Sequence, residues 1–354
     1  MSKTCIVTGG AGFIGSALSA GLVRRFDRVI AFDSLLAQVH GDTPRPPELD
    51  PAVELYRADV REAQAWTALL DTVDAVDTVI DLAAETGTGQ SLFSATRHTS
   101  VNVVGTSRMM DALAQTGKLP RQLLLTSSRA IYGEGAWRSA EGEIFYPGQR
   151  TDGQLAAGQW DFPGAVYLPA NAAWTQPHPT SVYGATKLCQ EHLLKAWGGA
   201  TGTQVKIVRL QNVYGPGQSL INAYTGIVPL FARMAKAGQS IPLYEDGQIV
   251  RDFVLIDDVR DAILAALDRD SAAGQTIDIG TGRMTTIADV AQVIARRYHA
   301  PAPHVSGDYR NGDVRCGACN GEPARRLLDF QARHGLEEGL NLLCQWIDDT
   351  LGAA

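Results

Sequence analysis

A glycine-rich turn directly after the first apolar run constrains the fold of this chain more than any other feature. Residues 4–8 form the apolar run, and the sequence Gly-Gly-Ala-Gly-Phe-Ile-Gly follows before a helical pattern begins. Gly9, Gly12 and Gly15 allow a tight turn, a close approach of the backbone to a pyrophosphate, and close packing of helix on strand. The start of the helix presents free N–H groups to such an anion. We therefore expect a dinucleotide site here, although with 36 glycines in the chain a purely structural turn is the alternative.

Short apolar runs alternate with amphipathic stretches along the chain, which predicts an α/β protein with a doubly wound, parallel sheet of the Rossmann type. The expected strands are residues 4–8, 28–33, 53–57, 78–83, 122–127, 206–210 and 276–279. The expected helices are residues 13–26, 61–73, 98–115, 182–196, 228–237, 257–267 and 287–298.

An acidic residue in the expected place identifies the dinucleotide. Asp33 ends the second predicted strand, where a carboxylate accepts hydrogen bonds from the adenosine ribose and repels a 2′-phosphate. Asp33 therefore favours NAD over NADP. Asp59 and Val60 follow the third strand and are candidates to face the adenine; equally, Asp59 could be the N-cap of a helix that begins at Arg61.

The 354 residues exceed what one hydrophobic core supports, so we expect two lobes. Residues 1–213 are predicted to form the NAD-binding domain, with an insert around residues 134–179. Residues 214–354 are predicted to form mainly a smaller, mixed α/β substrate-binding lobe, from which residues 275–281 return to the sheet. The insert has no clear period, and it is either a lid over the site or a disordered surface excursion.

A serine, a tyrosine and a lysine predict hydride-transfer chemistry. Tyr183 and Lys187 are four residues apart at the start of a predicted helix, so their side chains share one face; an ordinary exposed pair is the alternative. We expect Lys187 to lower the pKa of the phenol from about 10 toward neutrality, so that it can take a hydroxyl proton. Ser128 follows the fifth predicted strand, at the carboxyl edge of the sheet where the glycine turn also lies. These groups beside a nicotinamide would deprotonate an alcohol as its hydride leaves.

Composition excludes several other classes of protein. A net charge of -7 argues against a broad surface for nucleic acid, and no apolar run approaches the length of a membrane span. Cys316 and Cys319 form a lone C-x-x-C motif without the second pair that a zinc ribbon needs, so we expect inert thiols and no metal. The start of the chain lacks a secretory pattern, and five cysteines suit a reducing compartment, so we expect a cytoplasmic protein.

Five motifs together resemble the extended short-chain dehydrogenase/reductases that act on nucleotide sugars, the NAD-dependent epimerase/dehydratase family. They are residues 8–15, 127–133, 183–187, 212–217 and 251–253. The resemblance covers nearly the whole chain. Within the family, residues 82–91 and 128–135 are most similar to the dTDP-L-rhamnose 4-epimerase branch.

The residues and the resemblance together give a set of candidate site residues. The candidate catalytic residues are Ser128, Tyr183 and Lys187. The candidate NAD-binding residues are Gly9, Gly12, Phe13, Ile14, Gly15, Asp33, Asp59, Val60, Ala83, Ala84 and Lys187. The candidate substrate-binding residues are Thr86, Ser128, Arg129, Tyr183, Asn212, Arg251 and Arg315. By resemblance, Thr86 faces the hexose, and Asn212, Arg251 and Arg315 hold the diphosphate, for which arginine provides a bidentate fork.

One departure from the family pattern decides the type of reaction. The 4,6-dehydratases of this family carry Thr-Asp-Glu where this chain has Ser128, Arg129 and Ala130, and elimination of water needs that acid and base. We therefore predict C4 epimerisation of a nucleotide-activated 6-deoxyhexose, with dTDP as the expected nucleotide, through a transient 4-keto sugar. A 4-ketoreductase with the same residues is the nearest alternative, and a non-catalytic NAD-binding regulator is the alternative from another class.

The resemblance also implies a homodimer. In this superfamily the helices that correspond to residues 98–115 and 182–196 pair across a two-fold axis into a four-helix bundle. The expected partners are therefore a nucleotide sugar and a second copy of the chain, with neither nucleic acid nor membrane.

Overall fold

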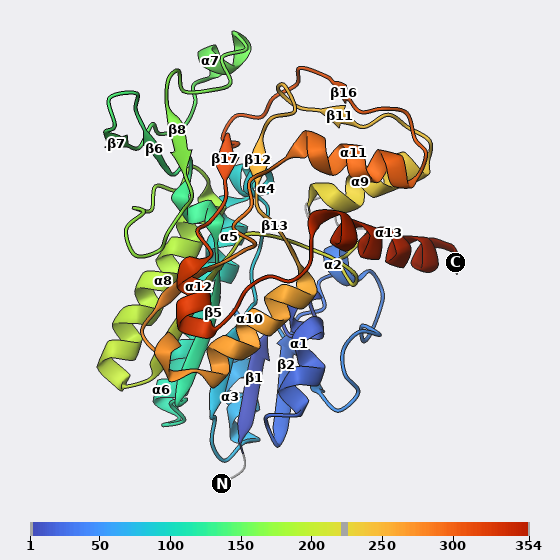
Figure 1. Cartoon of the computed structure of the whole chain (residues 1–354). Coiled ribbons are helices and arrows are strands. Elements are labelled where there is room, and N and C mark those ends of the chain that lie inside the picture. The colour runs from blue at the N-terminus through green and yellow to red at the C-terminus, as the bar shows by residue number, and fades with distance from the viewer. Residues whose placement is uncertain (1–2, 221–225, 353–354) are drawn as a thin grey trace.

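The computed structural model describes residues 3–220 and 226–352. Its centre is a seven-stranded sheet in the order β14-β9-β5-β4-β1-β2-β3, and every neighbouring pair is parallel (Figure 1). The strands are β1 (Thr4–Thr8), β2 (Arg28–Asp33), β3 (Glu54–Arg57), β4 (Thr78–Asp81), β5 (Gln122–Ser128), β9 (Gln204–Leu210) and β14 (Thr276–Ile279). The predicted doubly wound parallel sheet is confirmed.

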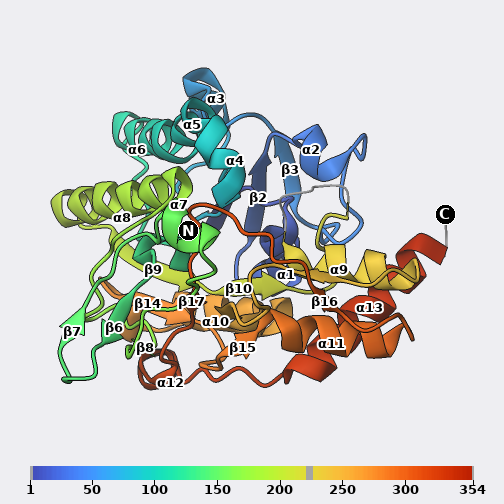
Figure 2. The ribbon, with the colours of Figure 1, turned by 90° about the horizontal axis from the view of Figure 1, so that it is seen from above.

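Helices cover both faces of the sheet because successive apolar residues of each strand point to opposite sides. Val7 of β1 belongs to a core with α1 (Phe13–Val23), α10 (Ile256–Asp268) and α12 (Glu322–Leu328). Its neighbour Ile6 belongs to a separate core on the other face. The helices of that second face are α3 (Ala63–Asp71), α6 (Thr106–Gln115) and α8 (Val182–Thr201). Figure 2 shows the two layers from above.

The second half of the chain forms a lobe with its own core and also contributes to the sheet layer. The core of this lobe lies between α9 (Ile227–Lys236), α11 (Ile287–Arg297) and α13 (Leu336–Gly352). Its short strands are β10 (Asn212–Tyr214), β11 (Pro242–Leu243), β12 (Val250–Arg251), β13 (Phe253–Leu255), β15 (Thr285–Thr286), β16 (His304–Val305) and β17 (Cys316–Gly317). Strand β14 pairs with β9, and α10 packs on α1, so the chain crosses between the two parts more than once.

The insert at residues 134–179 is folded, so its reading as a disordered excursion is wrong. It contains a small antiparallel sheet of β6 (Ala136–Arg138), β7 (Ile144–Phe145) and β8 (Val166–Leu168), together with α7 (Asp152–Ala156). Trp137 of β6 and Tyr167 of β8 pack against Ala318, and the Tyr167 hydroxyl donates to the Ala318 carbonyl. The insert is therefore attached to the second half of the chain (Figure 1).

One predicted helix has an irregular start. Residues 98–115 were expected as one α-helix, but α5 (Ala95–Thr99) leads into a π-helical segment (Ser100–Gly105) before α6 begins. The remaining short helices are α2 (Ala37–His40), α4 (Thr88–Phe93) and the 3-10 turns Arg129–Tyr132 and Asp270–Ala272. Among the helices in residues 3–220 and 226–352, none has the length and apolar composition to cross a bilayer.

Candidate active site

The glycine turn between β1 and α1 leaves no room for side chains. Gly9 has a φ of +61°, and a Cβ there would lie 2.9 Å from the Ala83 Cα. A Cβ on Gly15 would lie 2.4 Å from the Gly10 carbonyl oxygen. Helix α1 begins at Phe13 without a side-chain cap, so the N–H groups of its first turn, including that of Ile14, can bind an anion. The turn thus fits the pyrophosphate of a dinucleotide.

Asp33 is held at the carboxyl end of β2 by the turn itself. Its carboxylate accepts hydrogen bonds from the backbone N–H of Ala11 at 3.0 Å and of Leu35 at 2.9 Å. The His40 imidazole lies 3.8 Å from it. A carboxylate fixed beside the glycine turn suits an adenosine ribose, so the residues present fit NAD.

Asp59 and Val60, in the turn that follows β3, have different surroundings. Asp59 forms an ion pair with Arg61 at 2.6 Å, and Glu62 is the N-cap residue of α3. The N-cap interpretation of Asp59 is therefore wrong, because the helix begins later than predicted. Val60 is buried against Trp66 in the core under this edge of the sheet.

A buried network that the sequence did not reveal joins the first turn to β4. The Thr8 hydroxyl donates to the Asp81 carboxylate at 2.6 Å and accepts from the backbone N–H of Leu82 and Ala83. The Thr106 hydroxyl donates to the other Asp81 oxygen at 3.0 Å. This network places residues 83–84, the predicted NAD contacts, beside Gly9. The sequence indicated this network only by a threonine that ends one strand and an aspartate that ends a neighbouring strand.

Ser128 and Tyr183 come together because α8 begins against the loop that follows β5. The Ser181 hydroxyl caps α8 by accepting the Gly184 N–H at 3.0 Å. A Cβ on Gly184 would lie 2.5 Å from the Ala130 carbonyl oxygen, so only glycine permits this approach. Burial raises the pKa of the Tyr183 phenol, whereas a hydrogen bond with Ser128 and the charge of Arg129 lower it.

Lys187 lies one turn farther along α8 and is 2% exposed. Burial lowers the pKa of its ammonium to about 8, against the opposing charges of Asp81 and Glu191. The charge of Arg129 lowers the pKa of Tyr183 in this structure, and the predicted effect of Lys187 on that pKa stays a prediction.

The π-helical segment supports the same end of α8. The buried Asn102 side chain donates to the Thr186 hydroxyl at 2.9 Å and to the Glu85 carbonyl at 3.0 Å, and it accepts from the Glu85 N–H. The widened turn thus places an amide between the β4 loop and the helix that carries Tyr183. Sequence reasoning missed Asn102, because a π-turn has no clear sequence signal.

Asn212, Arg129 and Arg251 gather where β10, β12 and β17 meet the loop after β5. The Asn212 side-chain oxygen accepts from the Arg129 Nε at 2.9 Å. Arg251 pairs with Asp313 at 2.6 Å and donates to the Val250 carbonyl. Three of the predicted substrate-binding residues thus lie in one region, next to Ser128.

The remaining two predicted substrate-binding residues are placed differently. Arg315 is 3% exposed, and its guanidinium pairs with three carboxylates, those of Asp161, Glu245 and Asp246. Its donors are engaged by these carboxylates in this structure, and its role in holding a diphosphate stays a prediction. Thr86 is exposed in the loop after β4, where its carbonyl lies 3.2 Å from the imidazole Nε2 of His98.

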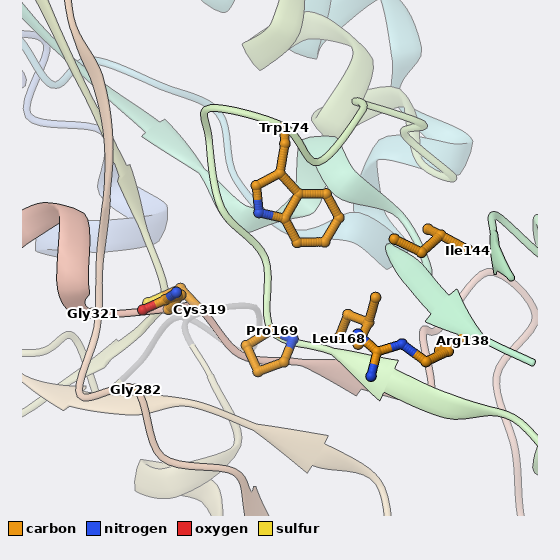
Figure 3. A pocket seen from close by; sticks show the side chains of 9 residues that line it. Arg138, Ile144, Leu168, Pro169, Trp174, Gly282, Cys319 and Gly321 are labelled. Carbon is orange, nitrogen blue, oxygen red and sulfur yellow. The ribbon is translucent and has the colours of Figure 1, made fainter. Parts of the chain in front are cut away.

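Cys316 lies in β17, beside the strand that carries Arg251, and Cys319 follows shortly after it. Both thiols are free, and burial raises the pKa of Cys316 to about 11 and that of Cys319 well above its usual range, so both are protonated near neutral pH. Cys319 lines a pocket of about 360 Å³ between the insert and the second lobe, across which the Trp174 indole lies (Figure 3). None of the predicted site residues lines this pocket. Within residues 3–220 and 226–352, no cluster of three or more His, Cys, Asp or Glu side chains could hold a metal.

Known proteins match the chain over nearly its whole length. The model of the NAD dependent epimerase/dehydratase family matches residues 5–149 and 164–280. A dTDP-L-rhamnose 4-epimerase of Burkholderia thailandensis is 54% identical over 349 residues, which cover 99% of this chain and 96% of that protein.

Two solved structures share the fold. The UDP-glucose 4-epimerase of Thermotoga maritima with UDP-glucose has a TM-score of 0.81 and 25% identity, and the match covers 98% of this chain and 99% of that one. The UDP-glucose 4-epimerase of Thermus thermophilus in complex with NAD has a TM-score of 0.77 and 26% identity, over 97% and 98% of the two chains.

Proposed function

This chain belongs to the NAD dependent epimerase/dehydratase family, and from that premise we propose that it epimerises dTDP-L-rhamnose at C4. NAD is the cofactor, and the enzyme is an isomerase that uses it without net oxidation. The observation that carries the proposal is the 54% identity to a dTDP-L-rhamnose 4-epimerase over 99% of the chain. The Ser128, Tyr183 and Lys187 set beside an NAD-compatible turn supports it.

The chain's own residues supply the proton chemistry in this proposal. The Tyr183 phenolate oxygen takes the proton of the C4 hydroxyl, and Ser128, which hydrogen-bonds the phenol, orients that hydroxyl. Bound NAD supplies reversible hydride acceptance, so that C4 becomes a ketone and is reduced again on its opposite face. In this proposal Lys187, which is buried one turn after Tyr183 on α8, binds the cofactor's ribose. Arg251 and Asn212 hold the diphosphate while the sugar ring turns.

The residues after Ser128 argue against dehydration. Arg129 donates to Asn212, and Ala130 has no group that transfers a proton, so elimination of water across C5 and C6 lacks its acid and base. The residues present are compatible with a reaction limited to one carbinol carbon, such as epimerisation at C4.

The test is turnover without an external reductant. Protein purified with NAD should convert dTDP-L-rhamnose to a mixture with its C4 epimer, read by proton NMR, with no NADH added. A requirement for stoichiometric NADH would establish a 4-ketoreductase instead. UDP- and GDP-activated 6-deoxyhexoses, run in parallel, establish the nucleotide preference.

We also propose that two copies associate through α8 and its neighbours. Leu92 and Phe93, at the end of α4, are 63% and 88% exposed, and Val104 is exposed on the adjacent π-helical segment. Helices α4 and α5 both contact α8, so these apolar side chains border the helix expected at the dimer axis. Light scattering should report a dimer, and Phe93→Asp should convert it to a monomer with NAD still bound.

Five free thiols suit the cytoplasm, where we expect the enzyme to act.

A further inference from the structure

A chain of side-chain contacts crosses the carboxyl edge of the sheet at β1. The guanidinium of Arg97, in α5, pairs with the Glu85 carboxylate at 2.8 Å and donates to the side-chain oxygen of Gln38 at 3.1 Å. Glu85 lies in the loop after β4, and Gln38 lies in α2, which follows β2. Because β1 stands between β4 and β2 in the sheet, these three side chains, the Arg97 bridge, span the glycine turn that follows β1. Figure 2 shows α5 and α2 on opposite sides of β2.

The end of the bridge on the β4 side is firmly held. The buried Asn102 side chain binds the backbone of Glu85 twice, because it donates to the Glu85 carbonyl at 3.0 Å and accepts the Glu85 N–H at 2.8 Å. The Glu85 side chain is itself only 12% exposed. Arg97 therefore reaches toward α2 from a fixed carboxylate.

The α2 end of the bridge has little packing of its own. Helix α2 is a single turn of four residues, none of them buried. It is bounded by Leu35 with a φ of +50° and Gly41 with a φ of +58°, left-handed values that a leucine seldom adopts. Polar contacts therefore determine where α2 lies. They include the bond from Arg97 and a bond from the second half of the chain, in which the Ser219 hydroxyl donates to the Val39 carbonyl at 2.8 Å.

We propose that Arg97 closes the cofactor groove and keeps NAD on the enzyme through both hydride transfers. The glycine turn and Asp33, which fit the pyrophosphate and the adenosine ribose, lie along the stretch of sheet edge that the bridge spans, from β4 to β2. Release of the dinucleotide then requires the bridge to open and α2 to move away. Arg97 acts through α2, so it is a positioning residue that does not touch the reacting atoms.

Retention of the cofactor matters because an epimerase needs two hydride transfers in opposite directions. The first leaves a 4-keto sugar and a reduced cofactor, and the second returns the hydride to C4. Loss of the reduced cofactor between the two would leave a free ketone and an enzyme without NAD. An enzyme that consumed NAD as a co-substrate would instead have to exchange it at every turnover. The inference rests on the proposed function in this respect, whereas the closure of the groove does not depend on it.

The test measures the rate of NAD release from Arg97→Met, Arg97→Lys and Arg28→Met. Arg28 gives the matched control, since it pairs with Glu54 at the same 2.8 Å, is 30% exposed against 36% for Arg97, and lies at the amino end of β2. Each protein is loaded with radiolabelled NAD and chased with unlabelled NAD. Arg97→Met should release it about 3- to 10-fold faster than the wild type, as loss of one exposed ion pair and one hydrogen bond allows. Arg97→Lys should lie between, and Arg28→Met should match the wild type.

Two further measurements distinguish closure of the groove from a general structural role. High salt screens an exposed ion pair, so it should speed NAD release from the wild type and affect Arg97→Met less. In the epimerase assay, turnover by Arg97→Met should decline with time and recover when NAD is added, because cofactor lost between the two transfers is replaced.

An unchanged release rate in Arg97→Met, or an equal acceleration in Arg28→Met, would overturn the proposal. If Arg97→Met does not fold, as judged by circular dichroism, Glu85→Gln removes the ion pair while keeping Arg97 and decides by the same criteria. Absence of epimerisation, with NAD release still dependent on Arg97, would overturn the proposed function and leave the role of Arg97 standing.

Discussion

Gly184→Ala should lower kcat strongly and the free energy of unfolding only slightly, because Gly184 sets the distance between α8 and the loop that carries Ser128. The added Cβ would lie 2.5 Å from the Ala130 carbonyl oxygen, whereas ordinary contacts begin at 3.4 Å. Helix or loop must therefore yield by about 0.9 Å. Tyr183, the adjacent residue, moves with the helix. A displacement of about 1 Å in a catalytic group costs about 100-fold in rate, which is the loss of kcat that we expect.

The stability of this variant should change much less. Alanine favours the helix by about 1 kcal/mol over glycine, and overpacking costs about 1–3 kcal/mol, so the free energy of unfolding should fall by about 0–2 kcal/mol. A folded enzyme with that loss remains almost fully folded, so unfolding would not account for the lower kcat.

Gly199→Ala in the same helix is the matched control, since a Cβ there meets nothing within 4 Å. It should gain up to about 1 kcal/mol of stability with kcat unchanged. The assays are NMR turnover of dTDP-L-rhamnose and urea unfolding followed by circular dichroism. Wild-type turnover in Gly184→Ala would refute the claim that this close approach positions Tyr183.

Three further predictions concern the proton acceptor and two buried charged groups. Tyr183→Phe should lower kcat by about 10²- to 10⁴-fold, as loss of a general base does, while NAD content after purification stays at the wild-type level; a drop in NAD content would point to a structural role instead. Arg150→Met leaves Glu134 and Glu245 without their shared cation and should cost about 3–5 kcal/mol in urea unfolding, so an unchanged midpoint would contradict the network. Burial raises the pKa of Asp278 from 3.8 to about 7, so the folded protein retains a proton that the unfolded chain releases, and this contribution lowers the free energy of unfolding as pH rises from about 4 to about 7. Asp278→Asn should flatten that part of the pH dependence, measured by urea unfolding at several pH values.

The strands were predictable from sequence because each is an apolar run between turn residues. One strand end is an exception with a non-local cause. The strand expected at residues 78–83 ends at Asp81, since the N–H groups of Leu82 and Ala83 turn toward the Thr8 hydroxyl. That bond joins residues about 75 positions apart, which no local pattern reports.

The site was predictable where its residues share one short segment and unpredictable where distant segments meet. The positions of Gly9, Asp33 and Ser128 follow from the strand that each one ends or follows. The partners of Arg315 come from the insert and from the turn before β12, so its sequestration could not be seen in the sequence. The sequence left two interpretations of the insert open, a lid and a disordered excursion, because its strands have two or three residues each, too few to show a period.

The buried ion pairs of the insert determine which parts of the molecule can move independently. Arg150 bonds to Glu134 and Glu245 at once, and Arg315 links Asp161 to the same carboxylate cluster. These ion pairs connect the small antiparallel sheet to the second lobe. Separating the two would leave buried charges without partners. We therefore expect the insert and the second lobe to behave as one rigid unit.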